Sequence, residues 1–392
     1  MLGHHGPYLD WMTRGLAERG FDVDVVTLPE TIEPSAGRAS DHPRVSVHFV
    51  GGPKARRLPL ENRNGVVGLL TRELAYWRLF RAWYTAHAGV VRPDLVFLPY
   101  LDYCLYAVGL AGSPFGHCPW AGLAMRPAFH YREMGIRAPT PALAKVKKAL
   151  FLRAARSPHL KCLLTIDEPL ASYVATHQCA LSKVVFFPEP AELGDLPAAH
   201  DAKQKFGFAP ERKVILLYGA LSARKGVAEL LRALAAPGFP KELDVLLAGQ
   251  VAEPETRAVL GAPWVQALRN QGRLKVVDRF IDVEEEPALF AAADVVWLGY
   301  RNHYNASGLL VQAANAGRPV LSCDEGVLGW QVARHHLGRT VNPENPAAVA
   351  AAASALLDTA SSDAPIGADA TSLRPPSFAE AQDTLARALG GD

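Results

Sequence analysis

Short apolar runs alternate with helically spaced segments along most of the chain. Runs bounded by turn residues predict strands, and segments with apolar positions three or four residues apart predict helices. The strands predicted in the N-terminal half are 21–28, 94–99, 119–123, 161–166 and 183–187. The helices predicted there are 10–19, 71–88 and 141–155. This alternation is typical of a parallel α/β sheet.

The C-terminal half repeats the alternation more clearly. Its predicted strands are 214–218, 244–249, 274–277, 295–298 and 320–323. Its predicted helices are 226–236, 256–270, 284–292, 309–316 and 346–357, and a last short helix covers 378–389. The two halves together predict an α/β fold of two doubly wound domains.

A chain of 392 residues is too long for one ordinary core. Residues 187–212 carry four prolines and little periodicity, which predicts an interdomain linker. We therefore predict an N-terminal domain over 1–188, a C-terminal domain over 189–375 and a separate helical segment over 376–392.

The beginning of the chain departs from the doubly wound pattern. Such a domain normally opens with a strand that leads into its first glycine-containing loop. Here the loop Gly3-His4-His5-Gly6-Pro7 follows Met1 almost directly. We expect that the native start lies upstream, and the alternative is a domain that tolerates a missing strand.

Composition narrows the class of protein. Hydrophobic residues make up 49% and charged residues 20%, as in globular proteins, and a net charge of +2 argues against a nucleic-acid partner. No apolar run reaches the roughly 18–20 residues that span a bilayer, and no signal-peptide pattern opens the chain. The five scattered cysteines form no CxxC pair, so we expect buried, reduced thiols, no metal site and a cytoplasmic protein.

Two segments carry candidate chemistry. The first, 216–226, reads as a strand, a turn at Gly219 and a helix start, with Arg224 and Lys225 just before the helix. Two cations beside unpaired helix amides would suit a diphosphate, although a solvated basic loop is the alternative. The second segment, 300–320, runs from a strand through Ser307 and Gly308 into a helix. The backbone amides of its turn could also bind a phosphate. Taken alone, however, the segment is an ordinary strand-to-helix turn of an α/β fold.

Together these segments resemble family 4 of the retaining glycosyltransferases, which have the GT-B fold. The resemblance rests on the turn ending Arg224-Lys225-Gly226, the junction 291–296 and the stretch from Ser307 to Val320, in matching order over 213–357. The N-terminal half matches more loosely, through its glycine loop and the helix before Gly20. The resemblance implies two Rossmann-like domains facing across a cleft, with the final helix crossing back to the N-terminal domain.

The resemblance also implies what the residues do. Arg224 and Lys225 would stabilise the departing diphosphate, and backbone amides of the turn at 307–310 would hold the same phosphates. The N-terminal domain would bind the acceptor and the C-terminal domain the nucleotide-sugar. The implied donor-binding residues are Gly219, Arg224, Lys225, Tyr304, Ser307, Gly308, Leu309 and Gln312. The implied catalytic residues are Arg224 and Lys225.

The departures from the family pattern lie at the sugar end. Two glutamates eight positions apart, one facing the sugar and one the ribose, are replaced by Tyr304 and Gln312. Gln312 can still bond a ribose hydroxyl, whereas Tyr304 cannot replace a sugar-facing carboxylate. His303 or Asn305 could take over the sugar contacts.

We therefore expect a hexosyltransferase that moves a sugar from a nucleotide-diphosphate donor to an acceptor hydroxyl, with retention and without a metal or cofactor. The acceptor is left open between a sugar, a lipid-linked molecule and a small molecule. The alternatives are a non-catalytic GT-B scaffold or partner subunit, a GT-B sugar-nucleotide epimerase and a phosphorylase.

The N-terminal domain offers weaker candidates near predicted strand ends, where α/β sites form. We include His5 and His130 as catalytic candidates, with Asp102 and Arg126 as acceptor contacts. A single histidine is more often structural. The basic amphipathic stretch 137–161 is expected to bury its apolar face in the core, and weak peripheral contact with the inner face of the membrane is the alternative.

Overall fold

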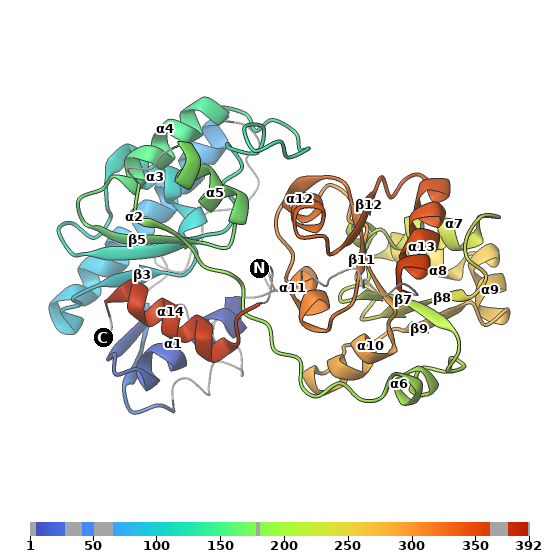
Figure 1. The fold of residues 1–392 in the computed structure, drawn as a ribbon. Helices are drawn as coiled ribbons and strands as arrows, with labels where there is room; N and C mark the ends of the chain where they lie inside the picture. Colours follow the sequence, from blue (N-terminus) through green and yellow to red (C-terminus); the bar gives the residue numbers. More distant parts are fainter. Residues whose placement is uncertain (1–4, 28–40, 51–65, 178–180, 361–374, 391–392) are drawn as a thin grey trace. The chain divides into compact units, whose positions relative to one another are not determined.

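The computed structural model describes residues 5–27, 41–50, 66–177, 181–360 and 375–390. The chain divides into two compact units, which we describe separately. Unit 1 comprises 1–135, 139–189 and 376–392, and unit 2 comprises 136–138 and 190–375. Figure 1 shows the elements of each unit.

Unit 1 contains only parallel strand pairs among its described residues. Its strands are β1 (Val23–Thr27), β2 (Val45–Phe49), β3 (Val96–Leu98), β4 (Trp120–Ala124), β5 (Leu160–Thr165) and β6 (Val184–Phe186). Its helices are α1 (His5–Glu18), α2 (Val66–Val91), α3 (Leu105–Ala111), α4 (Ala144–Ala155), α5 (Glu168–His177) and α14 (Phe378–Leu389). β1 pairs with β2, and a second sheet has the order β3-β4-β5-β6.

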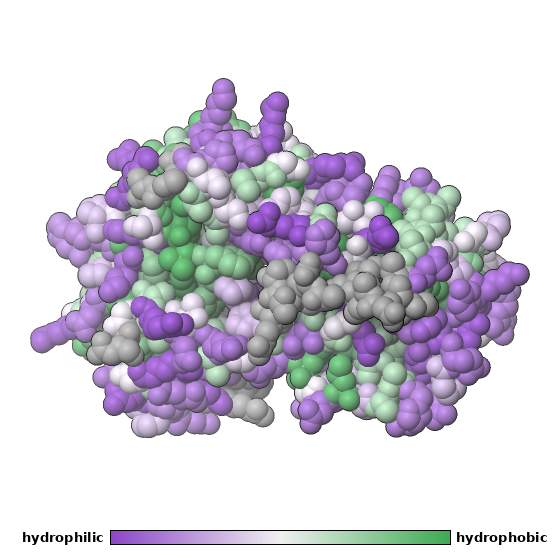
Figure 2. All heavy atoms as spheres, viewed as in Figure 1, coloured by the Kyte–Doolittle hydropathy of each residue, from purple (hydrophilic) through white to green (hydrophobic). Residues whose placement is uncertain are grey.

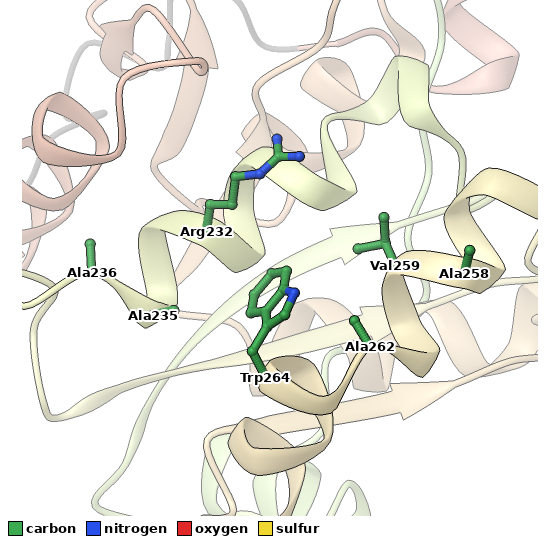
Figure 3. Close-up of a pocket in the computed structure, with 7 residues that line it drawn as sticks. All are labelled: Arg232, Ala235, Ala236, Ala258, Val259, Ala262 and Trp264. Atoms are coloured by element: carbon green, nitrogen blue, oxygen red, sulfur yellow. The ribbon is translucent and has the colours of Figure 1, made fainter.

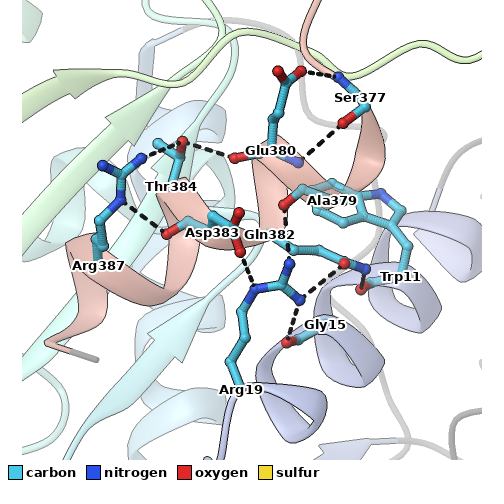
Figure 4. Close-up of polar contacts among 10 residues, drawn as sticks. All are labelled: Trp11, Gly15, Arg19, Ser377, Ala379, Glu380, Gln382, Asp383, Thr384 and Arg387. Carbon is cyan, nitrogen blue, oxygen red and sulfur yellow. Dashed lines mark hydrogen bonds and ion pairs between the residues drawn. The ribbon is translucent and has the colours of Figure 1, made fainter. Parts of the chain in front are cut away.

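The last helix, α14, belongs to unit 1 and packs against the first, α1. Arg19 connects them: its side chain donates to Asp383 Oδ1 at 2.6 Å and to Gln382 Oε1 and Ala379 O at 3.0 Å each (Figure 4). A capping box between Ser377 and Glu380 starts α14. Chain segments more than 350 residues apart in sequence thus share one hydrophobic core.

Unit 2 has a single six-stranded parallel sheet among its described residues. The strands are β7 (Lys213–Tyr218), β8 (Leu243–Ala248), β9 (Leu274–Val277), β10 (Val295–Leu298), β11 (Val320–Cys323) and β12 (Gly338–Val341). The helices are α6 (Ala199–Lys205), α7 (Val227–Ala235), α8 (Pro254–Gly261), α9 (Pro263–Asn270), α10 (Glu286–Ala292), α11 (Gly308–Asn315), α12 (Gly326–Arg334) and α13 (Pro346–Ala360).

The sheet order in unit 2 is β12-β11-β10-β7-β8-β9. The first strand, β7, lies in the middle, and the chain winds outward on one side before it returns to start β10 on the other. This is the doubly wound order, whose ligand site forms at the carboxyl ends of the two central strands, where the winding reverses. In unit 2 that switch point lies between β7 and β10.

The structure corrects several predicted elements. The helix predicted over 256–270 is two helices, because Pro263 has no N–H to continue α8 and instead starts α9. The predicted linker 187–212 contains α6, which packs against α10. The elements β2, α3, α5, α12 and β12 were not predicted.

Candidate functional site

The two candidate segments meet at the switch point of unit 2. The turn 223–225 follows β7 as a short 3₁₀ helix, and Tyr300 follows β10 after one glycine. The backbone N–H of Arg301 donates to Arg224 O at 2.8 Å, and Trp297 Nε1 donates to Lys225 O at 3.0 Å. These bonds fix the basic turn beside the carboxyl end of β10.

Lys225 is a buried ammonium, only 9% exposed. Its Nζ donates to the backbone oxygen of Tyr218 at 2.5 Å. Burial, followed by the neighbouring charge of Arg224, lowers the pKa of Lys225 to about 8. No carboxylate in the described parts of the chain forms an ion pair with it. A desolvated cation without an anionic partner is costly in the free protein and suits an anionic ligand.

Tyr300 links the basic turn to the turn at Ser307. The ring of Tyr300 lies 5.5 Å from Arg224 Cζ and from Lys225 Nζ, which is cation–π range. Its Oη accepts from Ser307 Oγ at 3.4 Å. Arg224 also lies 3.5 Å from the ring of His303, measured from its terminal nitrogen to Nδ1. The two segments quoted from the sequence therefore form one cluster.

Ser307 precedes α11, whose first residues are Gly308 and Leu309. The Ser307 side chain does not cap the helix, since its hydroxyl is directed to Tyr300. The first amides of an α-helix have no acceptor within the helix and carry partial positive charge. The start of α11 thus adds amide donors to the side of the cluster that carries two cations.

Gln312 lies one turn further along α11, and its amide faces a carboxylate. Gln312 Nε2 donates to Glu286 Oε2 at 3.0 Å, and Tyr218 Oη donates to Glu286 Oε1 at 2.5 Å. Burial raises the pKa of Glu286. Tyr304 is half-buried, and its backbone oxygen accepts from Val327 N at 3.0 Å.

Two glycines allow the basic turn to close. Gly219 has a φ of 98°, and a Cβ there would lie 2.5 Å from Lys225 Nζ. Gly226 has a φ of 71°, and a Cβ there would lie 2.2 Å from the backbone oxygen of Gly299. Both glycines have a left-handed φ, and at Gly226 the neighbouring atom also belongs to the backbone, so only glycine suits these positions without strain.

The N-terminal candidates have different surroundings. His130 is fully buried, with Nε2 3.3 Å from Asp167 Oδ1. Both carboxylate oxygens of Asp102 accept backbone N–H groups, from Met125 and Arg126 at 2.8 Å each, so Asp102 holds the loop after β4. Gly3 and His4 lie outside the described residues. His5 starts α1, and its side chain is not described.

The basic stretch predicted over 137–161 forms α4 over a shorter range. Phe151 is buried in the core of unit 1, and Lys148 pairs with Glu133 at 3.0 Å. Leu143 and Val146 are exposed. The surface near α4 is mostly hydrophilic with small hydrophobic patches (Figure 2). In the part of the chain that the structure describes, no helix is long and apolar enough to cross a membrane.

A separate open groove lies on the outer helices of unit 2 (Figure 3). It is lined by Arg232, Ala235, Ala236, Ala258, Val259, Ala262 and Trp264. None of these was predicted as a site residue. No cluster of His, Cys, Asp and Glu that could hold a metal ion occurs among the described residues. The four described cysteines are free thiols, and Cys118 is only half-buried.

Comparisons with known proteins fit this geometry. No curated protein matches the sequence. Residues 212–359 match the family described as "Glycosyl transferases group 1". Sucrose-phosphate synthase from Thermosynechococcus elongatus is a structural neighbour, with a TM-score of 0.66 and 17% identity over 97% of this chain and 91% of that one. The fold is GT-B. HepE from Anabaena, solved in complex with UDP, gives a TM-score of 0.65 at 16% identity over 99% and 96%.

The group 1 domain and the GT-B fold support the predicted glycosyltransferase enzyme. The predicted fold class, α/β with two Rossmann-like domains, is confirmed. The matched range 212–359 holds every predicted donor-binding residue.

Sequence reasoning missed Tyr218, Glu286 and Tyr300. Tyr300 directly follows the glycine after a predicted strand, a position where α/β sites form, and this signal was available. Glu286 belongs to the run Glu284-Glu285-Glu286, which reads as a solvated helix start. Only the tertiary fold brings its carboxylate to Gln312.

Proposed function

We propose that the chain transfers a hexose from a nucleoside-diphosphate-sugar to an acceptor hydroxyl. Lys225 is the observation that carries the proposal: a buried ammonium at the switch point without a carboxylate partner in the described chain. Arg224 and the start of α11 place further positive charge nearby. Such a site fits a diphosphate, and HepE, a structural neighbour, was solved with UDP.

Transfer breaks the bond between the anomeric carbon and the diphosphate oxygen, so negative charge grows on the leaving phosphate. Lys225, from its buried position, and Arg224, which is exposed, would stabilise that charge through preorganised contacts. Amides at Ser307, Gly308 and Leu309 would hold the phosphates, with Gly219 permitting their close approach.

The resemblance to family 4 supports retention of configuration. The acceptor hydroxyl would attack from the face that the diphosphate leaves, and the leaving phosphate would take its proton. This chemistry needs no metal, no cofactor and no protein nucleophile. Unit 1 would bind the acceptor, with His5 and His130 as its catalytic candidates. If the acceptor is lipid-linked, α4 is the surface we would expect at the cytoplasmic face of the membrane.

Incubation with a panel of UDP-, GDP- and ADP-sugars tests the proposal. We expect at least one donor to release its nucleoside diphosphate faster with the enzyme than without it. If the protein binds nucleoside diphosphates tightly but releases none from any donor, it is a non-catalytic GT-B scaffold. The presence of Tyr304 in place of a sugar-facing carboxylate is the observation that favours this alternative. Epimerised nucleotide-sugar without net transfer would favour an epimerase.

The pKa of Lys225 predicts how diphosphate binding depends on pH. Below about pH 8 the ammonium is charged, and a bound diphosphate keeps it charged. Above pH 8 the free enzyme loses this proton, so binding must first restore it. We expect the affinity for UDP or GDP to fall about tenfold between pH 7 and pH 9, a range in which the diphosphate is already fully ionised. Calorimetry at pH 7, 8 and 9 measures this, and a flat profile would contradict a role for Lys225.

A further inference from the structure

The carboxylate of Glu286 is a structural feature of unit 2 that no motif in the sequence indicated. It lies at the first residue of α10, between the end of β7 and the middle of α11. Each of its two oxygens accepts one hydrogen bond, Oε1 from Tyr218 and Oε2 from Gln312. All three side chains are half-buried, so the cluster can still meet a ligand.

The chemistry of this cluster determines which way the Gln312 amide points. An ionised carboxylate only accepts hydrogen bonds, so the Gln312 group that faces Glu286 must be its NH₂. The Gln312 carbonyl oxygen is then directed elsewhere. No bond from the described residues reaches this Oε1 atom. The cluster therefore presents an unused acceptor to any hydroxyl donor beside it.

The cluster is joined to the phosphate cluster through Tyr218. The backbone oxygen of Tyr218 binds Lys225 Nζ at 2.5 Å, while its side chain binds Glu286 at 2.5 Å. The oriented amide and the buried ammonium therefore belong to one hydrogen-bonded group at the carboxyl end of β7. A diphosphate on Lys225 would bring the rest of its nucleotide close to this group.

We propose that Glu286 is a positioning residue that turns the carbonyl oxygen of Gln312 toward the vicinal hydroxyls of the nucleotide's ribose. The proposal rests on the proposed function, because it requires a nucleoside diphosphate at the switch point. The Glu286 carboxylate stabilises one of the two possible orientations of the Gln312 amide. When Glu286 is ionised, the Gln312 NH₂ group must donate to it. The Gln312 carbonyl oxygen is then directed away from Glu286 and can accept a hydrogen bond from a ribose hydroxyl.

The test compares UDP and GDP with their 2′,3′-dideoxy analogues by calorimetry. The wild-type enzyme is expected to bind the ribonucleotide about five- to tenfold more tightly than the analogue, since a neutral hydroxyl contact contributes about that much. Glu286→Gln lets the Gln312 amide adopt either orientation, so this preference should fall below about twofold. Gln312→Ala should remove the preference, and the double variant should show no further loss.

Glu285→Gln is the matched control on the same helix start. Glu285 pairs with Arg279 at 2.6 Å and does not contact Gln312, so the preference for the ribonucleotide should stay at the wild-type value. If Glu286→Gln weakens both ligands equally, Glu286 is merely structural and the proposal is overturned. If the preference persists in Glu286→Gln but not in Gln312→Ala, Gln312 is oriented by another group. If no nucleoside diphosphate binds the wild-type protein, the proposed function itself fails.

Discussion

Replacing Lys225 with methionine is expected to weaken UDP or GDP binding roughly fiftyfold and, in the same variant, to raise the free energy of unfolding. A charge-assisted bond to a buried ion contributes about 2–3 kcal/mol, which sets the expected loss of affinity. Methionine has nearly the same length and shape, so it can fill the space of the lysine stem.

The gain in stability follows from the pKa of Lys225. In the folded protein this pKa is about 8, below the ordinary value of 10.5, so the unfolded chain binds the proton more strongly between these values. At neutral pH the fold therefore holds an unfavourable charge, at a cost of about 3 kcal/mol. Loss of the bond to Tyr218 O offsets about 1 kcal/mol. A net gain of about 2 kcal/mol at pH 7 should appear in urea unfolding, and it should disappear above pH 10.

Lys203→Met is the matched control. Lys203 is also buried, at 6% exposed, but its Nζ forms an ion pair with Asp294 at 2.8 Å. Removing it takes one of two ammonium partners from the half-buried Asp294, which keeps Lys213 at 3.1 Å, so Lys203→Met should lower the free energy of unfolding by about 1–3 kcal/mol and leave nucleotide affinity unchanged. If Lys225→Met destabilises the protein as Lys203→Met does, or binds UDP and GDP normally, Lys225 does not form an anion site.

The sequence predicts the local structure of this candidate site well where its signals lie close together along the chain. A strand followed by Gly219, and two cations directly before a helix, are all visible within about ten residues, and the structure brings Arg224 and Lys225 to the switch point. The turn at Ser307 begins α11 at the predicted place. The place of Arg224 and Lys225 could be predicted without knowledge of tertiary contacts, because the strand, the turn and the helix follow one another along the chain.

What escaped prediction depends on contacts between distant segments. The pairing of Glu286 with Gln312 joins residues 26 positions apart, and no spacing rule predicts it. The strand β2 follows a segment without regular periodicity, and α6 is a short, mostly polar helix whose packing against α10 overrides its weak pattern. His130 follows a predicted strand, and only the tertiary fold shows that its ring is enclosed by aromatic neighbours and Asp167.

The cluster around Glu286 bears on Gln312, the position where the resemblance to family 4 would place a glutamate. In the sequence, Gln312 stands where the resemblance implies a carboxylate, and this replacement by itself would weaken the donor site. In the folded chain a carboxylate is present beside Gln312, on a different helix. Tyr304 also has an acidic neighbour: burial, followed by the charge of the nearby Glu325, raises the pKa of Tyr304.

Replacing Gly226 with alanine is expected to lower the free energy of unfolding by about 3–5 kcal/mol and to abolish measurable diphosphate binding. Alanine at a φ of 71° costs about 1 kcal/mol. Its Cβ would also lie 2.2 Å from the backbone oxygen of Gly299, which follows β10. The 3₁₀ turn would have to move away from β10, breaking the bonds from Trp297 to Lys225 O and from Arg301 to Arg224 O.

Gly272→Ala is the control that distinguishes the cost of the positive φ from the cost of the close contact between the Gly226 position and Gly299. Gly272 lies in the same unit with a φ of 76°, but nothing lies within 4 Å of the position its Cβ would occupy. This variant should lose only about 1 kcal/mol and bind UDP and GDP as the wild type does. Urea unfolding and calorimetry on both variants measure the difference. Because the backbone conformation is nearly the same at both glycines, any excess loss at Gly226 comes from the contact between the basic turn and β10. Equal losses would mean that this contact does not hold Arg224 and Lys225 in place.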